Sequence, residues 1–192
     1  MEERTWIGVR YVDNLLLLSV GPNSLDSYPK WLRGIGNYGD TVLLEYEAHP
    51  EYLGMVLEPR GDNFHIGVLV PGFEEVLQEN GTIRVDRWRY RSFQAASSRT
   101  MAMSGAITRL HLAAKLAYPP VQAQIATAKL IAILSCMGFP NSSIMKAVSK
   151  LARKFPQVYT TVFLGTAKEA LSVEKADTLF KLRGLIGRLR FM

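Results

Sequence analysis

The sequence predicts an α+β fold, with a small antiparallel sheet in the first half and a helical bundle in the second. Short apolar segments separated by turn residues fill residues 5–69, whereas from Gln94 onward the chain is rich in Ala, Leu, Met and Lys. The charge changes near the same place. Residues 1–92 carry nine basic and fourteen acidic side chains, and residues 93–192 carry fourteen and three. We therefore predict two domains, at 1–92 and 93–192.

The first half contains a series of strand-like segments. Residues 5–11 and 15–20 are separated only by Val12, Asp13 and Asn14, which predicts a tight hairpin. Further strands are expected at 41–47, 52–57 and 63–69, with a short helix around Trp31. Together these strands predict one antiparallel sheet over residues 5–70. Residues 83–93 alternate aromatic and basic side chains, which favours an extended segment.

Five helices are expected in the second half, because its composition is rich in Ala, Leu, Met and Lys and poor in runs of β-branched residues, and clear breaks divide it. Pro119-Pro120, Gly138-Phe139-Pro140 and Pro156 supply these breaks. The expected helices are 94–117, 121–137, 142–155, 159–171 and 174–189.

Composition excludes several classes of protein. A chain of 192 residues with 48% hydrophobic and 21% charged residues is neither a disordered tail nor collagen-like. A single cysteine, Cys136, excludes a disulfide framework. Neither a secretory signal nor an apolar run long enough for a membrane span is visible, so we expect a soluble, intracellular protein without a membrane partner.

An acidic residue marks the first predicted hairpin, in the segment Arg10-Tyr11-Val12-Asp13-Asn14. A hairpin tip holds a carboxylate rigidly outside a sheet, and hard cations such as Mg²⁺ prefer rigidly placed oxygen ligands. Asp-Asn is also common turn chemistry. On the hairpin alone, a metal-binding role and a turn role both remain open.

The wider order of elements resembles the end of the palm of a reverse transcriptase, an RNA-directed DNA polymerase. Apolar strands flank Tyr-Val-Asp-Asn, and Tyr52-Leu53-Gly54 follows in a later strand. In that family a Tyr-x-Asp-Asp turn carries a metal-binding aspartate, a Leu-Gly strand pair forms the primer grip, and a helical thumb comes next. The resemblance implies that Asp13 and Asn14 are the catalytic positions, that Asp13 binds Mg²⁺ or Mn²⁺, and that Leu53 and Gly54 form the primer grip.

Two departures from the family limit the expected activity. Asn14 stands where the family has its second aspartate, and it offers a neutral oxygen in place of a charge. The residues before the hairpin contain no counterpart of the fingers or of the upstream palm strand with the partner aspartate. Two-metal phosphoryl transfer needs two ions about 3.5–4 Å apart. We therefore expect the chain to be inactive alone and to require a polypeptide with the fingers and upstream palm.

The predicted helix at 142–155 has one apolar and one basic face. The apolar face is formed by Ile144, Val148, Leu151 and Phe155, and the basic face by Lys146, Lys150, Arg153 and Lys154. Like charges at i, i+4 destabilise a helix, and no acidic residue lies between Asp86 and Glu169. This pattern favours contact with a nucleic-acid backbone, such as a primer–template duplex, over a merely solvated surface.

Gly54 is expected within a strand, where glycine marks a bulge or a close approach by another group. A primer terminus is the approaching group that the resemblance implies. Two functions therefore follow from the sequence. The first is the C-terminal palm and thumb of a reverse transcriptase-like nucleotidyltransferase, and the alternative is a non-catalytic nucleic-acid-binding module on a degenerate polymerase scaffold.

Overall fold

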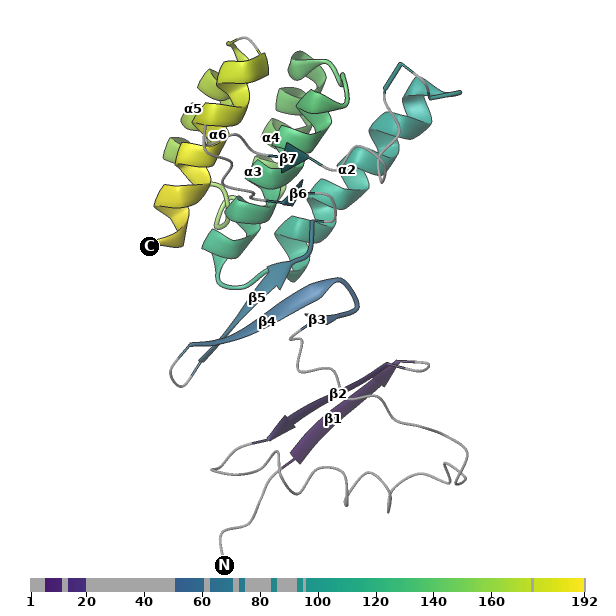
Figure 1. Cartoon of the computed structure of the whole chain (residues 1–192), viewed down its shortest axis with the longest axis vertical. Coiled ribbons are helices and arrows are strands. Elements are labelled where there is room, and N and C mark those ends of the chain that lie inside the picture. The colour runs from purple at the N-terminus through teal and green to yellow at the C-terminus, as the bar shows by residue number, and fades with distance from the viewer. Residues whose placement is uncertain are drawn as a thin grey trace, which may run out of the picture. The chain divides into compact units, whose positions relative to one another are not determined.

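The computed structural model describes residues 6–11, 14–19, 51–60, 63–70, 73–74, 84–85, 93–94, 96–173 and 175–191 (Figure 1). The chain forms two compact units, Met1–Leu53 and Gly54–Met192. The predicted α+β class is confirmed, because antiparallel strand pairs precede a set of helices in the chain.

The first unit contains the predicted hairpin of two apolar strands. Strand β1 (Trp6–Tyr11) pairs with β2 (Asn14–Ser19) in antiparallel register, from Trp6 opposite Ser19 to Tyr11 opposite Asn14. Asn14 therefore begins the second strand and does not belong to the connection. The predicted strand at 41–47 and the predicted helix around Trp31 lie outside the described residues.

The predicted strand at 52–57 is wrong at its centre, where Leu53 and Gly54 form a turn. This turn joins β3 (Glu51–Tyr52) to β4 (Met55–Arg60), with φ values of 51° at Leu53 and 78° at Gly54. Positive φ at both central residues is the geometry of a two-residue type I′ hairpin. Gly54 is thus explained by the turn conformation, since no described atom lies within 4 Å of a Cβ placed on it. The expected position of Gly54 within a strand is therefore wrong, and the approach of a primer terminus stays a prediction.

The predicted single sheet over 5–70 is also wrong for the described strands, which form two separate sheets in that range and a third after it. Strands β3, β4 and β5 (Asn63–Val68) form one of them, β1 and β2 another, and β6 (Phe73–Glu74) with β7 (Arg84–Val85) the third. The hairpin β4–β5 contacts the helices, because the backbone N–H of Ile66 donates to the Tyr118 carbonyl at 2.6 Å and Tyr118 donates back at 2.8 Å. The unit boundary at 53/54 therefore precedes the 92/93 boundary that we inferred from composition.

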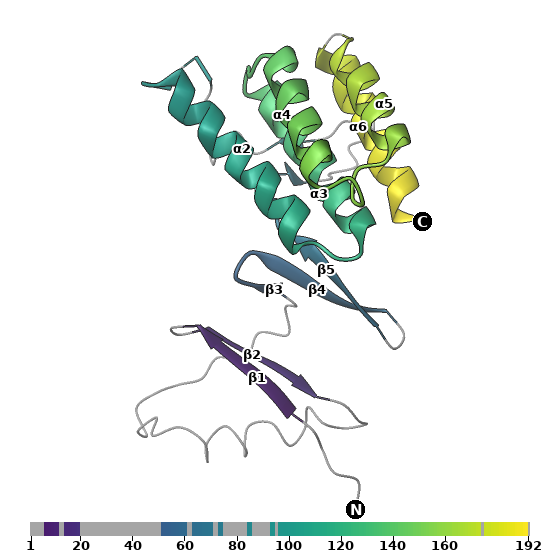
Figure 2. The ribbon, with the colours of Figure 1, turned by 180° about the vertical axis from the view of Figure 1, so that it is seen from behind.

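Five described helices follow, each close to its expected position: α2 (Arg99–Leu116), α3 (Pro120–Cys136), α4 (Asn141–Lys154), α5 (Thr161–Leu171) and α6 (Lys175–Arg190). Ser98 and Thr160 cap α2 and α5, since their hydroxyls accept hydrogen bonds from backbone N–H groups in the first turn. Prolines precede or open α3 and α4, where a missing N–H costs nothing. Figures 1 and 2 show α3 and α4 between α2 and the pair α5–α6.

Helix α3 is the centre of the helical core. It packs against each of the other four helices and is buried on nearly every side, so it has no polar face. Two buried polar side chains on α3 form hydrogen bonds with the segment after α4. Gln124 Nε2 donates to the Val158 carbonyl at 2.6 Å, and Thr127 Oγ1 lies 2.8 Å from the Tyr159 hydroxyl. These bonds tie α3 to the connection between α4 and α5.

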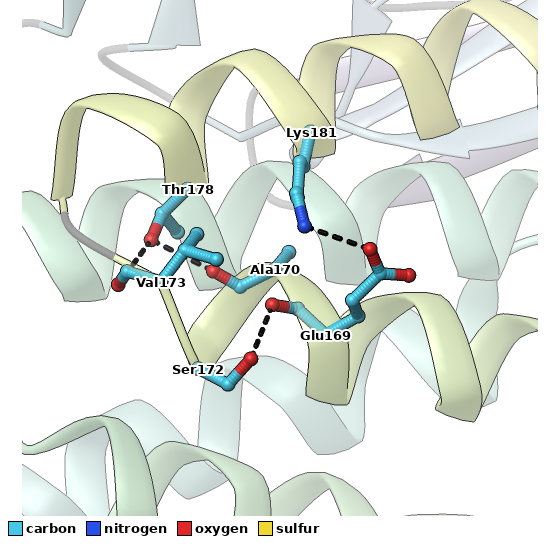
Figure 3. Close-up of polar contacts among 6 residues, drawn as sticks. All are labelled: Glu169, Ala170, Ser172, Val173, Thr178 and Lys181. Carbon is cyan, nitrogen blue, oxygen red and sulfur yellow. Dashed lines mark hydrogen bonds and ion pairs between the residues drawn. The ribbon is translucent and has the colours of Figure 1, made fainter.

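The corner between α5 and α6 is held by side-chain contacts (Figure 3). The buried hydroxyl of Thr178 donates to the Ala170 carbonyl at 2.8 Å, and Ser172 Oγ donates to the Glu169 carbonyl at the same distance. Lys181 Nζ lies 2.7 Å from Glu169 Oε1. The hydrogen bond from Lys181 and its charge lower the pKa of the Glu169 carboxyl.

A pH dependence of stability follows from Tyr159. Burial raises its pKa from 10.0 to about 12, although the hydrogen bond with Thr127 acts in the opposite direction. The unfolded chain therefore loses this proton first, and stability falls as the pH rises from 10 through 12. Two pKa units correspond to about 2.7 kcal/mol. Urea unfolding of wild type and Tyr159→Phe between pH 8 and 12 should show that the variant lacks this part of the decline.

The stability of wild type and Tyr159→Phe at pH 8 serves as the control for this comparison. At pH 8, Tyr159→Phe should be less stable by about 1–2 kcal/mol, because the buried Thr127 hydroxyl loses its partner. Parallel stability curves for the two proteins at alkaline pH would contradict the expectation.

Candidate nucleic-acid interface

Helix α4 places apolar and basic side chains on opposite faces. The side chains turned into the core are Ile144, Ala147, Val148, Leu151 and Ala152. Those exposed to solvent include Lys146, Lys150, Arg153 and Lys154, which we call the basic α4 face. The structure thus brings together the four cations that the sequence placed on one face.

The positions of two of these four cations are explained by interactions within the helix and its C-terminal end. Arg153 and Lys154 lie in the last turn, where cations interact favourably with the helix dipole. Lys154 Nζ also lies 5.8 Å from the centre of the Phe155 ring. Lys146 and Lys150 lie in the interior of the helix, one turn apart, and repel each other by a few tenths of a kcal/mol. Within the described part of the chain, neither forms an ion pair that would offset this repulsion.

The neighbouring helices extend the positive charge. Figure 2 shows α4 between α2 and α5. Exposed cations on these two helices are Arg99, Arg109, Lys115 and Lys168. The acidic residue of this group of three helices is Glu169, and Lys181 binds its carboxylate. The charge of this carboxylate is therefore largely compensated locally.

Helix α2 adds exposed apolar side chains that the sequence did not assign to a face. Met101 is 75% exposed, and Leu112 and Leu116 are also exposed. The helix shows little segregation of polar and apolar residues along the sequence, so periodicity alone gave no signal for this surface. Its position is determined by packing against α3.

The Leu53–Gly54 turn presents a leucine in an unfavourable conformation. Leu53 is 49% exposed at a φ of 51°, in the left-handed region that favours Gly, Asn or Asp. A leucine there costs about 1–2 kcal/mol and gains little from burial. The turn therefore displays an apolar side chain at the tip of a hairpin, and local folding alone does not explain its presence.

The predicted catalytic hairpin is described only in its strands. Asp13 lies outside the described residues, and Asn14 is placed by its backbone pairing with Tyr11. Among the described residues, no three His, Cys, Asp or Glu side chains come together as they would around a metal ion. In the part of the chain that the structure describes, no helix is both long and apolar enough to cross a membrane.

Comparison of the chain with protein-family models, with curated proteins and with solved structures found no match.

A substitution at the turn tests whether the leucine at position 53 lowers the stability of the fold. Leu53→Asn should raise the free energy of unfolding by about 0.5–1 kcal/mol, because Asn adopts a positive φ at lower cost. Gly54→Ala is the matched control and should lower it by about 1 kcal/mol, since alanine is strained at a φ of 78°. Urea denaturation measures both. A loss of stability in Leu53→Asn would show that the leucine serves the fold.

Proposed function

We propose that the second unit holds a primer–template duplex on the basic α4 face. In this proposal the chain acts as the palm and thumb of a reverse transcriptase-like polymerase. The observation that carries the proposal is the set of four exposed cations on one rigid helix, in a stretch without an acidic residue from Asp86 to Glu169. Such a surface attracts a polyanion, because each neutralised phosphate releases condensed counterions.

The geometry of the face suits backbone contact without base recognition. Lys146, Lys150 and Lys154 are spaced one turn apart over about 12 Å of helix. Lysine is a compact point charge that neutralises phosphates without distinguishing sequence, whereas Arg153 can bind one phosphate through two N–H groups. Contacts of this kind position a duplex and leave the base edges unread.

The Leu53–Gly54 turn has a role in this proposal as the primer grip. Gly54 permits the tight turn, and the exposed Leu53 side chain is available to contact the sugar and phosphate at the primer terminus. The strained conformation supports this assignment, because strain that folding does not require is typical of functional sites.

The catalytic part of the proposal rests on the resemblance at Asp13. A divalent ion bound there supplies charge stabilisation for phosphoryl transfer. The described residues provide no ligand set for such an ion, so we derive no step from it. Asn14 favours a second candidate function, a nucleic-acid-binding module that retains the polymerase scaffold without its chemistry.

Salt dependence tests the binding proposal. For about four phosphate contacts, the logarithm of the binding constant should fall with the logarithm of salt concentration with a slope near −3.6. Lys150→Ala should make this slope shallower by about one and weaken binding to all sequences alike. Fluorescence anisotropy with two RNA–DNA duplexes of unrelated sequence, at five salt concentrations, measures both effects.

The control is a cation on another helix, outside the basic α4 face. Lys129→Gln removes one positive charge from α3, and the slope should stay at its wild-type value. An equal effect of the two variants would mean that net charge alone governs binding. Absence of binding at low salt would exclude the proposed duplex interaction.

Primer extension separates the polymerase from the binding module. The chain alone should incorporate no nucleotide. When it is combined with a polypeptide that supplies the fingers and upstream palm, primer extension with Mg²⁺ or Mn²⁺ should appear, and Asp13→Asn should abolish it. Asn14→Asp should preserve or raise extension, because it adds a second charged ligand.

Binding of the duplex by each variant is measured in the same experiment. Retained binding without extension in the wild-type combination would favour the non-catalytic module. Extension that persists in Asp13→Asn would remove Asp13 from the proposed chemistry.

A further inference from the structure

Helix α2 lies at the edge of the helices of the second unit (Figures 1 and 2). It packs against α3, α4 and β5, and its buried side chains are Ala106, Leu110, Ala113 and Ala114. In both views no described helix lies against its opposite side. That side is therefore open to a further element.

The open side of α2 carries a row of apolar and small residues, which we call the α2 seam. Its members follow one another at spacings of four, three, four and four residues, so they share one face of the helix over about 22 Å. All are exposed, with Met101 75% exposed. Spacings that alternate between three and four residues are typical of a helix face that contacts another helix. The members are Met101, Gly105, Thr108, Leu112 and Leu116.

Gly105 is the point of the seam at which a second helix can approach most closely. Glycine is unfavourable in a helix interior compared with alanine, and no described atom lies within 4 Å of a Cβ placed on Gly105. The described packing therefore does not require glycine here. The hydroxyl of Thr108 donates to the Ser104 carbonyl at 3.0 Å, so this polar group is already bonded within the helix. The middle of the seam is thus low and largely apolar.

The net charge of α2 decides which kind of helix suits the seam. Exposed cations on α2 are Arg99, Arg109 and Lys115, and the sequence has no acidic residue in α2, α3 or α4. Helix α2 is therefore positive whatever bonds these three side chains form. A second copy of this chain on the same face would bring cations against cations. A helix with acidic residues beside its apolar face is complementary in both charge and hydrophobicity.

We propose that the α2 seam binds an acidic amphipathic helix of another protein. The apolar side chains of the partner helix pack on Met101, Leu112 and Leu116, and its backbone approaches α2 at Gly105. Its acidic side chains lie on the side of Lys115. A nucleic-acid backbone would gain nothing from the exposed leucines, which distinguishes this surface from the basic α4 face. The proposal does not depend on the proposed nucleic-acid function.

The test uses the full chain and three synthetic helical peptides of equal length as probes. The first has leucines at the spacing of the seam and glutamates beside them, the second has lysines in place of the glutamates, and the third has glutamines in place of the leucines. Fluorescence anisotropy at physiological salt measures binding. The first peptide should bind at least about tenfold tighter than either of the others, because it alone matches both the apolar seam and the positive charge. Equal binding of the first and third peptides would overturn the proposal, since charge alone would then govern binding.

Variants locate the binding surface. Leu112→Ser should weaken binding of the first peptide about tenfold, whereas Val162→Ser, the matched control at an exposed apolar position on α5, should change it by less than about twofold. Gly105→Gln should also weaken binding about tenfold, because its side chain blocks the close approach. The same variant should raise the midpoint of urea unfolding, since it removes glycine from a helix interior. Loss of folding would move the midpoint the other way. Unchanged binding in either seam variant would overturn the proposal.

Oxidation of methionine by dilute hydrogen peroxide reports whether the seam is open in the free chain. Met101 should form its sulfoxide rapidly, and Met137, which is buried in the core, should react slowly. The first peptide should protect Met101. Slow oxidation of Met101 in the free chain would mean that another part of the chain covers the seam. Stronger protection by vesicles containing phosphatidylserine would identify a bilayer as the occupant. Either of these two results would overturn the proposal.

Discussion

Helix α3 is buried along almost its whole length, and the other helices of the second unit pack around it. Such a helix is stable only if its buried polar side chains have hydrogen-bond partners, and Gln124, Thr127 and Ser135 each have one. The contacts of Gln124 and Thr127 reach the segment Val158–Tyr159, between α4 and α5. They fix where α4 ends and α5 begins. Because its apolar residues pack in this core, α4 turns its lysines and its arginine outward.

The helices were predictable because their signals are local. Prolines and glycines mark the breaks, and a composition rich in Ala, Leu, Met and Lys marks the helices, so the five helices agree with the structure within a few residues. The turn at Leu53 was not predictable, because leucine rarely adopts a positive φ and the segment lacks the usual Asn-Gly signature. The division into sheets was missed for another reason. The pairing of Ile66 with Tyr118 joins residues far apart in the sequence, which no local pattern reveals.

The candidate site residues also differ in whether a local sequence pattern could predict their arrangement. The basic α4 face lies on one helix, so its spacing could be derived from helix geometry alone. Leu53 and Gly54 were assigned to the primer grip from resemblance, and the structure adds the strained conformation. Asp13 lies outside the described residues, so its assignment still rests on the sequence.

The cations that take part in folding differ in their surroundings from those of the proposed binding surface. Lys181 meets Glu169 at 2.7 Å, and this ion pair supports the α5–α6 corner. Lys146 and Lys150 repel each other on α4, and no ion pair in the described structure offsets that repulsion. A repulsion of this kind is compensated when an external polyanion lies across the face, because neutralising each phosphate releases counterions. Binding would then depend on several charges on a rigid helix, whereas phosphoryl transfer would depend on the single carboxylate of Asp13. Under the proposed function, asparagine at position 14 would weaken the chemistry, while the proposed duplex-binding surface does not depend on it.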